Sequence, residues 1–289
     1  MKILVIGGSG FLGSHIADEL TSRGHEVTIF DKQDSEWAGE KQRVVLGDIS
    51  DTKILEKEIS KTEVVYHMAG IADIGEADQN PLDTISGNIV GSSTVMSLCA
   101  EHSVRLMYGS TVYVYSRHGS FYRASKQSVE TLIEVFHDVK GLDYTILRYG
   151  SLYGPRAQAW NGVRKIVTEM IKNKKIIFNG TGKEKREYIN VVDAARMSAD
   201  LLTDDYLQKA VTLTGLQVLT QEELLEMIAE IMDVEVSVNF NPDSSSDSHY
   251  KLTPYQYVPK SSVKLVSSEY IDIGQGLLEL ISEISSEVE

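Results

Sequence analysis

The chain has 289 residues, enough to build one large domain or two unequal ones around a sizeable core. Its 42 Asp and Glu outnumber its 28 Lys and Arg, which gives a formal net charge of −14. We therefore expect no nucleic-acid partner, because phosphate binding needs a concentrated basic surface and the sequence has no basic run.

Three further features of the composition narrow the class of protein. The single cysteine, Cys99, rules out an internal disulfide and fits a reducing cytoplasm. The apolar run at residues 3–6 is far too short to span a membrane. The seven histidines show no metal-ligand spacing. We expect a cytoplasmic protein with no membrane partner and no metal site.

The first predicted unit is a strand at residues 3–6, followed by a glycine-rich turn and a helix. Glycines at positions 7, 10 and 13 allow a tight turn, close approach of the backbone to a pyrophosphate, and close packing of helix on strand. The helix N-terminus offers free N–H groups to phosphates. A glycine triplet alone also occurs in turns that bind nothing, but the strand and helix on either side favour a dinucleotide site.

The second predicted strand, residues 26–30, ends at Asp31. A carboxylate at this place accepts hydrogen bonds from the adenine ribose and repels a 2′-phosphate. The sequence therefore predicts NAD rather than NADP.

Further apolar runs at residues 44–46, 64–66, 104–108 and 144–147 alternate with helical patterns at 89–100 and 128–136. This alternation predicts an α/β fold of the Rossmann type, a doubly wound parallel sheet within residues 1–150. Ligands bind at the carboxyl ends of such strands. The segments that follow the runs, at 47–49, 67–70 and 109–111, are therefore expected to line the site.

Tyr122 and Lys126 lie four residues apart at the start of a predicted helix. This spacing puts both side chains on one face, where an ammonium stabilises a phenolate. The phenol can then accept a proton from an alcohol. An isolated pair of this kind is usually ordinary helix surface, so its position among the other motifs is what favours catalysis.

Residues 151–289 show a different pattern, with clustered turn residues between predicted helices near 162–173, 191–203, 220–232 and 273–285. We expect mainly a smaller substrate-binding lobe, with some segments returning to the first domain. The serine-rich segment 243–248 is predicted to be a surface loop.

Together these motifs resemble the extended short-chain dehydrogenase/reductases, specifically the NAD-dependent epimerase/dehydratase family that acts on nucleotide sugars. The resemblance covers nearly the whole chain and implies NAD as cofactor and a nucleoside-diphosphate sugar as substrate. The cofactor contacts that it implies are Gly7, Gly10, Phe11, Leu12, Gly13, Asp31, Asp48, Ile49, Met68, Ala69, Gly70, Asn88, Tyr122, Lys126 and Tyr149. It also implies a homodimer formed through the helices near 88–101 and 122–139.

The catalytic hydroxyl in this family lies three residues before a Val-Tyr pair, and two such pairs occur here, at 112–113 and 114–115. The first would put Gly109 at the catalytic position, so we choose the second, which selects Thr111, with Ser110 as the alternative. In the mechanism that the resemblance implies, Tyr122 takes the proton of a sugar hydroxyl while nicotinamide accepts hydride from the same carbon. Lys126 holds the nicotinamide ribose and lowers the pKa of Tyr122.

The second half carries a signature similar to that of the family's substrate site. Residues 147–156 resemble Arg-Tyr-x-Asn-Val-Tyr-Gly-Pro-Arg, with Ser151 where Asn is frequent, and residues 179–193 resemble a glycine-rich turn followed by Arg-Asp-Phe-Ile. Arg186 would bind the diphosphate, although a solvated surface charge is the alternative interpretation. The substrate contacts that the resemblance implies are Ser110, Thr111, Tyr122, Ser151 and Arg186.

The sequence departs from the family pattern at two places that bear on the type of reaction. Val112 and Tyr113 stand where dehydratases carry Asp-Glu, and the loop at residues 116–121 is shorter than usual. We therefore expect a 4-epimerase that works through a transient 4-keto sugar. A sugar dehydrogenase or reductase, or a dehydratase of the same family, is the first alternative. A non-catalytic NAD-binding sensor or scaffold is the second.

Overall fold

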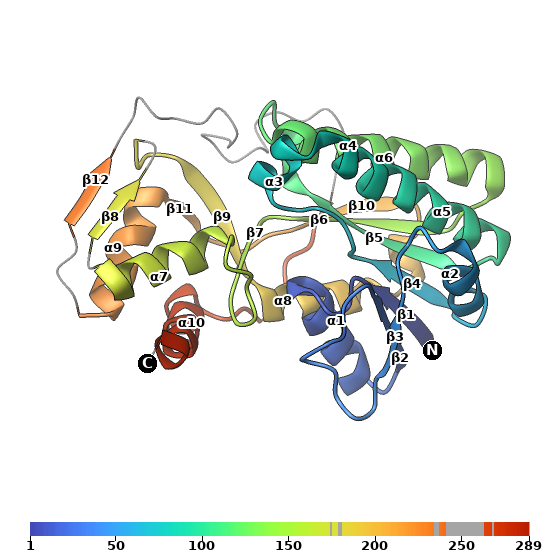
Figure 1. The fold of residues 1–289 in the computed structure, drawn as a ribbon, viewed down its shortest axis with the longest axis horizontal. Helices are drawn as coiled ribbons and strands as arrows, with labels where there is room; N and C mark the ends of the chain where they lie inside the picture. The colour runs from blue at the N-terminus through green and yellow to red at the C-terminus, as the bar shows by residue number, and fades with distance from the viewer. Residues whose placement is uncertain (174, 179–180, 234–236, 241–262, 268, 289) are drawn as a thin grey trace.

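The computed structural model describes residues 1–173, 175–178, 181–233, 237–240, 263–267 and 269–288. Figure 1 shows a larger lobe built on a central sheet and, to its left, a smaller lobe formed by segments from the second half of the chain. The predicted α/β class and doubly wound parallel sheet are confirmed.

The central sheet contains eight parallel strands within the described residues, in the order β13-β10-β6-β5-β4-β1-β2-β3. Their bounds are β1 (Lys2–Ile6), β2 (Glu26–Asp31), β3 (Arg43–Leu46), β4 (Val64–His67), β5 (Arg105–Thr111), β6 (Tyr144–Tyr149), β10 (Lys209–Leu213) and β13 (Val263–Lys264). The strand order reverses between β1 and β4. The carboxyl ends of these two strands therefore border the crevice where folds of this class bind ligands.

The inner strands are continuous apolar runs because helices cover both faces of the sheet. Ile3 and Val5 pack on the layer that contains α1 (Phe11–Ser22) and α8 (Val191–Asp200). Leu4 and Ile6 pack on the layer of α2 (Thr52–Ile59), α5 (Ser92–Glu101) and α6 (Ser120–Lys140) (Figure 1). Cys99 is fully buried in this second layer, as a small apolar residue would be.

Short helical segments carry the chain between the strands and the long helices. They are α3 (Ile74–Gln79), α4 (Pro81–Thr84), the π-helix η1 (Ile85–Gly91) and the 3-10 helices η2 (Val112–Tyr115) and η3 (Asp204–Tyr206). Helix α6 begins after Gly119 and ends at Gly141, both of which have a positive φ, 100° and 71°. Glycine adopts this left-handed conformation without steric cost, so the two residues set the limits of α6, the helix that carries Tyr122 and Lys126.

Two strands of the central sheet lie beyond residue 150. Strand β10 pairs in parallel with β6, and β13 pairs with β10, so these segments return to the larger lobe. The pattern of short apolar runs did not predict them, because their placement depends on pairing with strands remote in the sequence. The helix predicted at 191–203 ends earlier, at Asp200.

In the residues that the structure describes, the smaller lobe contains two small sheets and three helices. Strands β7 (Ser151–Tyr153), β9 (Lys185–Asn190) and β11 (Val218–Thr220) form one sheet, and β8 (Lys175–Phe178) pairs with β12 (Ser237–Phe240) in the other. Helices α7 (Gly162–Asn173), α9 (Gln221–Ile231) and α10 (Ile273–Val288) surround a separate core that includes Val167, Leu224 and Leu277. This second core explains why the lobe stands apart in Figure 1.

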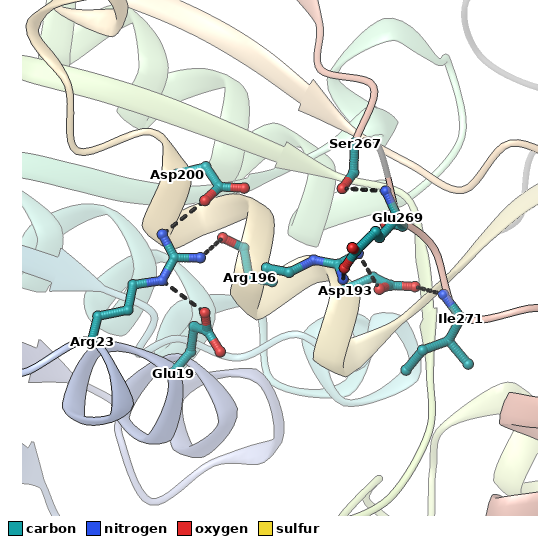
Figure 2. A network of polar contacts seen from close by, with 8 residues as sticks. All are labelled: Glu19, Arg23, Asp193, Arg196, Asp200, Ser267, Glu269 and Ile271. Atoms are coloured by element: carbon teal, nitrogen blue, oxygen red, sulfur yellow. Dashed lines mark hydrogen bonds and ion pairs between the residues drawn. The ribbon is translucent and has the colours of Figure 1, made fainter.

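A polar network fastens α1 and α8 to the segment that leads into α10 (Figure 2). Arg23, directly after the end of α1, bonds Glu19 and Asp200, each at 2.7 Å. On the next turns of α8, Arg196 bonds Asp193 at 2.7 Å, and the other carboxylate oxygen of Asp193 accepts the backbone N–H of Ile271 at 2.7 Å. The path of the chain from the large lobe back to α10 is therefore held by charge-assisted hydrogen bonds.

The described part of the chain lacks two features that other classes of protein have. None of its helices is long and apolar enough to cross a bilayer. Within the same residues, no group of three or more His, Cys, Asp or Glu side chains is arranged to hold a metal ion. The predicted loop at 243–248 lies outside the described residues.

Candidate active site

The glycine turn between β1 and α1 has no room for side chains. A Cβ on Gly7, which has a φ of 83°, would lie 2.5 Å from the backbone nitrogen of Ala69, and a Cβ on Gly13 would lie 2.1 Å from the Gly7 carbonyl oxygen. Gly10 begins α1 without a side-chain cap, and no acidic residue lies in the first turn of the helix. The turn therefore leaves the helix N–H groups available to an anion, which fits the pyrophosphate of a dinucleotide.

Asp31 lies beside this turn at the end of β2. Its two carboxylate oxygens accept the backbone N–H groups of Ser9 at 3.0 Å and Gln33 at 3.2 Å. These bonds orient a partly exposed carboxylate at the place where the adenine ribose is expected. The turn and Asp31 together therefore fit NAD.

The two apolar residues of the turn pack in different ways. Phe11 is buried with Ala157 and Val191, and its ring meets His15 edge to face at 6.2 Å between centroids. Leu12 is half-buried beside the same cluster. Phe11 therefore joins the turn to the second half of the chain, a contact that the turn motif alone does not reveal.

Asp48 and Ile49 follow β3 on the same side of the sheet. The exposed carboxylate of Asp48 accepts the backbone N–H of Ser50 at 2.8 Å, and this hydrogen bond lowers the pKa of Asp48. The side chain of Ile49 lies against Gly91, where a Cβ would approach its terminal carbon to 2.3 Å. Gly91 is thus required for η1 to pack on the loop after β3.

The loop after β4 is held by backbone contacts to the neighbouring strand. The N–H groups of Met68 and Ala69 both donate to the Ile6 carbonyl oxygen, at 2.8 and 3.0 Å. Gly70 follows with a φ of 153°, and a Cβ there would lie 2.9 Å from the Asn88 Oδ1 atom. The predicted cofactor loop therefore runs directly beside the glycine turn.

Asn88 clamps this loop to the catalytic helix. Its side chain accepts the N–H of Ile71 at 2.7 Å and donates to the Ile71 carbonyl at 2.9 Å and to the Ser125 hydroxyl at 3.0 Å. Asn88 is fully buried within the π-helix η1. A π-helix is rare and often marks a functional site, here because it aims the amide of Asn88 at two other segments.

Thr111, Tyr122 and Lys126 meet at the carboxyl end of β5. The Thr111 side chain lies close enough to the Tyr122 phenol to act on its pKa, which it lowers. Lys126 is buried, donates from Nζ to the Gly109 carbonyl oxygen at 2.7 Å, and lies over the Tyr108 ring at 4.8 Å from its centroid. The three predicted catalytic residues thus form one group on β5 and α6.

Burial sets the proton affinities of this group. Although part of the Tyr122 ring reaches solvent, burial raises the pKa of Tyr122 to about 12, and the Thr111 side chain opposes this rise. Burial lowers the pKa of Lys126 to about 8, against the attraction of Glu130. The protein alone therefore does not lower the pKa of Tyr122. The positively charged nicotinamide ring of bound NAD would be the additional charge that lowers it.

Ser110 points to a different group, a buried ion pair beneath the site. Its hydroxyl donates to Glu130 at 2.6 Å, and Glu130 also accepts two bonds from Arg148, at 3.0 and 2.7 Å. Arg148 donates a further bond to the Tyr115 hydroxyl at 2.6 Å. Thr111 rather than Ser110 is therefore the hydroxyl next to Tyr122.

The sequence reasoning missed the Glu130–Arg148 pair, although a signal was present. Glu130 lies four residues after Lys126 on the same helix face, and Arg148 stands in a strand that is otherwise apolar. A charge in such a strand must find an opposite charge, since an unpaired buried ion is very costly.

Tyr149, Ser151 and Arg186 are placed at the junction with the smaller lobe. The Tyr149 hydroxyl bonds Ser198 of α8 at 2.6 Å within the core, where burial raises the pKa of Tyr149. Its side chain therefore supports the sheet. Ser151 begins β7 opposite Tyr188, and Arg186 is a half-buried residue of β9 opposite Leu219.

Comparison with known proteins identifies the family of the chain. The pattern of the "NAD dependent epimerase/dehydratase family" matches residues 3–210. UDP-glucuronic acid decarboxylase 1 of Arabidopsis thaliana is 25% identical over 314 aligned residues, which cover 100% of this chain and 71% of that protein. A putative UDP-glucose 4-epimerase of Methanocaldococcus jannaschii is 29% identical over 253 residues, or 78% and 81% of the two chains.

The fold is also that of a solved structure. UDP-glucose 4-epimerase from Thermotoga maritima, determined with UDP-glucose, aligns over 100% of both chains with a TM-score of 0.85 and 24% identity. The family pattern spans most of the larger lobe, including the glycine turn, Asp31 and the group on β5 and α6. The chain belongs to the NAD-dependent epimerase/dehydratase family, and NAD is its cofactor.

Proposed function

We propose that the protein is a nucleotide-sugar 4-epimerase that oxidises the C4 hydroxyl of its substrate and then reduces the ketone from the opposite face. The observation that carries this proposal is the meeting of Thr111, Tyr122 and buried Lys126 beside the glycine turn. A proton acceptor next to a dinucleotide site is what carbinol oxidation requires. The residues after Thr111 are Val112 and Tyr113, which supply no carboxylate for an elimination.

In this proposal each residue of the group has one task. Tyr122 takes the proton of the C4 hydroxyl and later returns it, Thr111 holds the reacting oxygen, and the Lys126 ammonium stabilises the phenolate. NAD, when bound, supplies the two-electron acceptor and then the donor at C4. The C4–H and O4–H bonds break together and both form again after the sugar has turned over, so no oxidant is consumed.

A second candidate is decarboxylation of a nucleotide-linked uronic acid. The Arabidopsis relative bears that name and its alignment covers the whole chain, which favours this candidate. It needs the same first step, because oxidation at C4 turns a C5 carboxylate into a β-keto acid that loses carbon dioxide readily. Decarboxylation was not among the alternatives drawn from the sequence.

One experiment separates the candidates. Purified protein is incubated with UDP-glucose, UDP-N-acetylglucosamine and UDP-glucuronic acid, and proton NMR spectra and carbon dioxide release are followed. We expect the C4 epimer of one substrate without net NADH. A pentose product with released carbon dioxide would instead establish decarboxylation, and stoichiometric NADH would establish a dehydrogenase.

The role of Tyr122 has its own test within this experiment. Tyr122→Phe removes the proton acceptor and is expected to lower kcat by at least ~100-fold, the usual contribution of a general base. NAD binding, measured by calorimetry, should be retained because the glycine turn is unchanged. Undiminished turnover by this variant would remove Tyr122 as the base.

We also propose that the protein forms a homodimer through the outer face of α4, η1 and α6. Four apolar side chains on these elements are largely exposed: Leu82 at 77%, Val90 at 59%, Val135 at 49% and Val139 at 70%. Figure 1 shows α4, α5 and α6 along the same side of the larger lobe. Exposed apolar side chains gathered on adjacent helices are typical of a protein interface.

A further inference from the structure

Tyr113 makes two contacts with the catalytic group. It lies in η2, directly after Thr111, and its backbone N–H donates to the Thr111 Oγ1 atom at 3.2 Å. Its ring meets the Tyr122 ring at 6.2 Å between centroids with an interplanar angle of 75°, an edge-to-face contact. One residue therefore touches both the catalytic hydroxyl and the catalytic phenol.

Gly119 provides the space for the Tyr113 ring. A Cβ on Gly119 would lie 2.7 Å from Cδ1 of Tyr113 and 3.0 Å from Cβ of Arg123, and Gly119 has a φ of 100°. Gly119 also begins α6, the helix that carries Tyr122. The Tyr113 ring is thus fitted between the start of the catalytic helix and the ring of the base.

We propose that Tyr113 is a positioning residue: its ring fixes the plane of the Tyr122 phenol while its backbone N–H fixes the Thr111 hydroxyl, so that both oxygens face one reacting carbon. This proposal rests on the proposed function of Tyr122. An edge-to-face pair holds two rings at a defined angle, whereas an aliphatic side chain of similar size does not. The Tyr113 ring also excludes water from one edge of the phenol.

The test replaces the ring in two ways. Tyr113→Leu is expected to lower kcat about tenfold with little change in KM, which matches the loss of one aromatic contact in the transition state. Tyr113→Phe retains the ring and should recover most of this loss. In Tyr113→Leu the apparent pKa of the Tyr122 limb in the pH–rate profile should fall, because water reaches a phenol whose pKa burial had raised.

A double-mutant cycle tests the fit between Gly119 and Tyr113. Gly119→Ala should lower kcat strongly in the wild type, because its methyl group displaces the Tyr113 ring, but much less in Tyr113→Leu. Gly141→Ala is the matched control, since Gly141 ends the same helix with a φ of 71° and has no atom within 4 Å of the added methyl. It should reduce stability only.

The outcomes separate this proposal from the proposed function. If the wild type converts no nucleotide sugar, 3-fluorotyrosine placed at position 122 still reports the phenol titration by ¹⁹F NMR, and Tyr113→Leu should shift that titration to lower pH. An unchanged titration and an unchanged kcat in Tyr113→Leu, or additive effects of the two substitutions in the cycle, would overturn the positioning role.

Discussion

Tyr122 and Lys126 illustrate how a single environment acts in opposite directions on an acid and a base. Burial disfavours the charged form of each, so it raises the pKa of the phenol and lowers that of the amine. The ammonium bonds the Gly109 carbonyl rather than the phenol in this structure. In the proposed mechanism, Lys126 would stabilise the Tyr122 phenolate through its charge, and only while it is protonated.

The protonation of Lys126 leads to a prediction for the pH dependence of activity. Because the pKa of Lys126 is about 8, we expect kcat/KM to fall as pH rises above that value and the positive charge is lost. Lys126→Arg keeps the charge at these pH values and should remove the fall, even if its maximal rate is lower. Initial rates measured from about pH 6 to about pH 10, roughly two pH units on either side of the Lys126 pKa of about 8, test this. A falling limb that persists in Lys126→Arg would assign it to another group.

The lowered pKa of Lys126 also makes the free energy of unfolding depend on pH, and the direction of this dependence follows from the protons that each state binds. The folded pKa of Lys126, about 8, lies below the ordinary value of 10.5 for a lysine, so the unfolded chain binds more protons between these values. Lys126 therefore makes the free energy of unfolding rise with pH across this window. Lys126→Met should lack this part of the rise when urea denaturation is compared at the two ends of the window. If the free energy of unfolding depended on pH in the same way in the wild type and in Lys126→Met, the lowered pKa of the buried ammonium would be contradicted.

At the level of elements, the site depends on how η1, α6 and the ends of β4 and β5 meet. Asn88 joins η1 to the loop after β4 and to Ser125 of α6 through three hydrogen bonds. Replacing this buried amide is costly. Its partners at Ile71 and Ser125 would stay buried without a hydrogen bond, and a buried polar group without a partner destabilises the folded state. The π-helix therefore fixes the loop after β4 against α6, next to the proposed cofactor site.

Asn88→Asp tests this clamp. The substitution removes both N–H donors and places a carboxylate oxygen against the Ile71 carbonyl, so we expect the free energy of unfolding to fall by about 2 kcal/mol. We also expect weaker NAD binding by calorimetry, since the loop at 69–71 loses its anchor. Asn173→Asp, an exposed position at the end of α7, is the control for the added charge. Equal stability of the two variants would show that the clamp contributes nothing.

The predicted elements agree with the structure where the local sequence pattern determines an element. They differ from the structure where pairing with a distant strand determines it. The strand at 26–30 and the helix at 162–173 match β2 and α7 closely, because each carries a complete apolar period within one segment. Strand β5 runs to Thr111, beyond the predicted end at 108, because Ser110 and Thr111 pair with β6. Polar residues in a strand end give no periodic signal, so this extension was not predictable.

For the molecule as a whole, the contact between the lobes passes through the corner at Pro155 and Arg156. The Arg156 guanidinium bonds Asp18 of α1 at 2.7 Å and lies over the Trp37 ring at 4.9 Å, while the backbone N–H of Arg156 donates to Glu283 of α10 at 3.1 Å. Arg156 thus joins the large lobe to the last helix of the small one.

Arg156→Ala should weaken this connection. Loss of a partly exposed ion pair and a cation–π contact is expected to lower the free energy of unfolding by about 1 kcal/mol. Arg43→Ala, which removes an ion pair to Glu58 within the large lobe, is the matched control. Only Arg156→Ala should also increase proteolytic cleavage between the lobes. The same cleavage pattern in both variants would exclude a role for Arg156 in joining them.

The proposed dimer is tested by molar mass in solution. Light scattering should give twice the 32.1 kDa of one chain. The double substitution Val135→Glu, Val139→Glu places charges in the proposed interface and should yield monomers. Leu278→Glu, at a similarly exposed apolar position on α10, should not. A monomeric wild type would contradict the proposed dimer. A dimer in all three proteins would show that the dimer forms through another surface.

The sequence by itself determined the glycine turn and the placement of Tyr122 and Lys126 on one helix face, and it predicted NAD from the carboxylate of Asp31. Each of these depends on spacing within one short segment, which backbone geometry translates directly into position. Only the tertiary structure decided that Thr111 rather than Ser110 meets Tyr122, that Glu130 pairs with Arg148, and that Tyr113 packs on the catalytic ring. These contacts join segments remote in the chain, and the direction of each side chain follows from the packing of whole elements rather than from its neighbours in sequence.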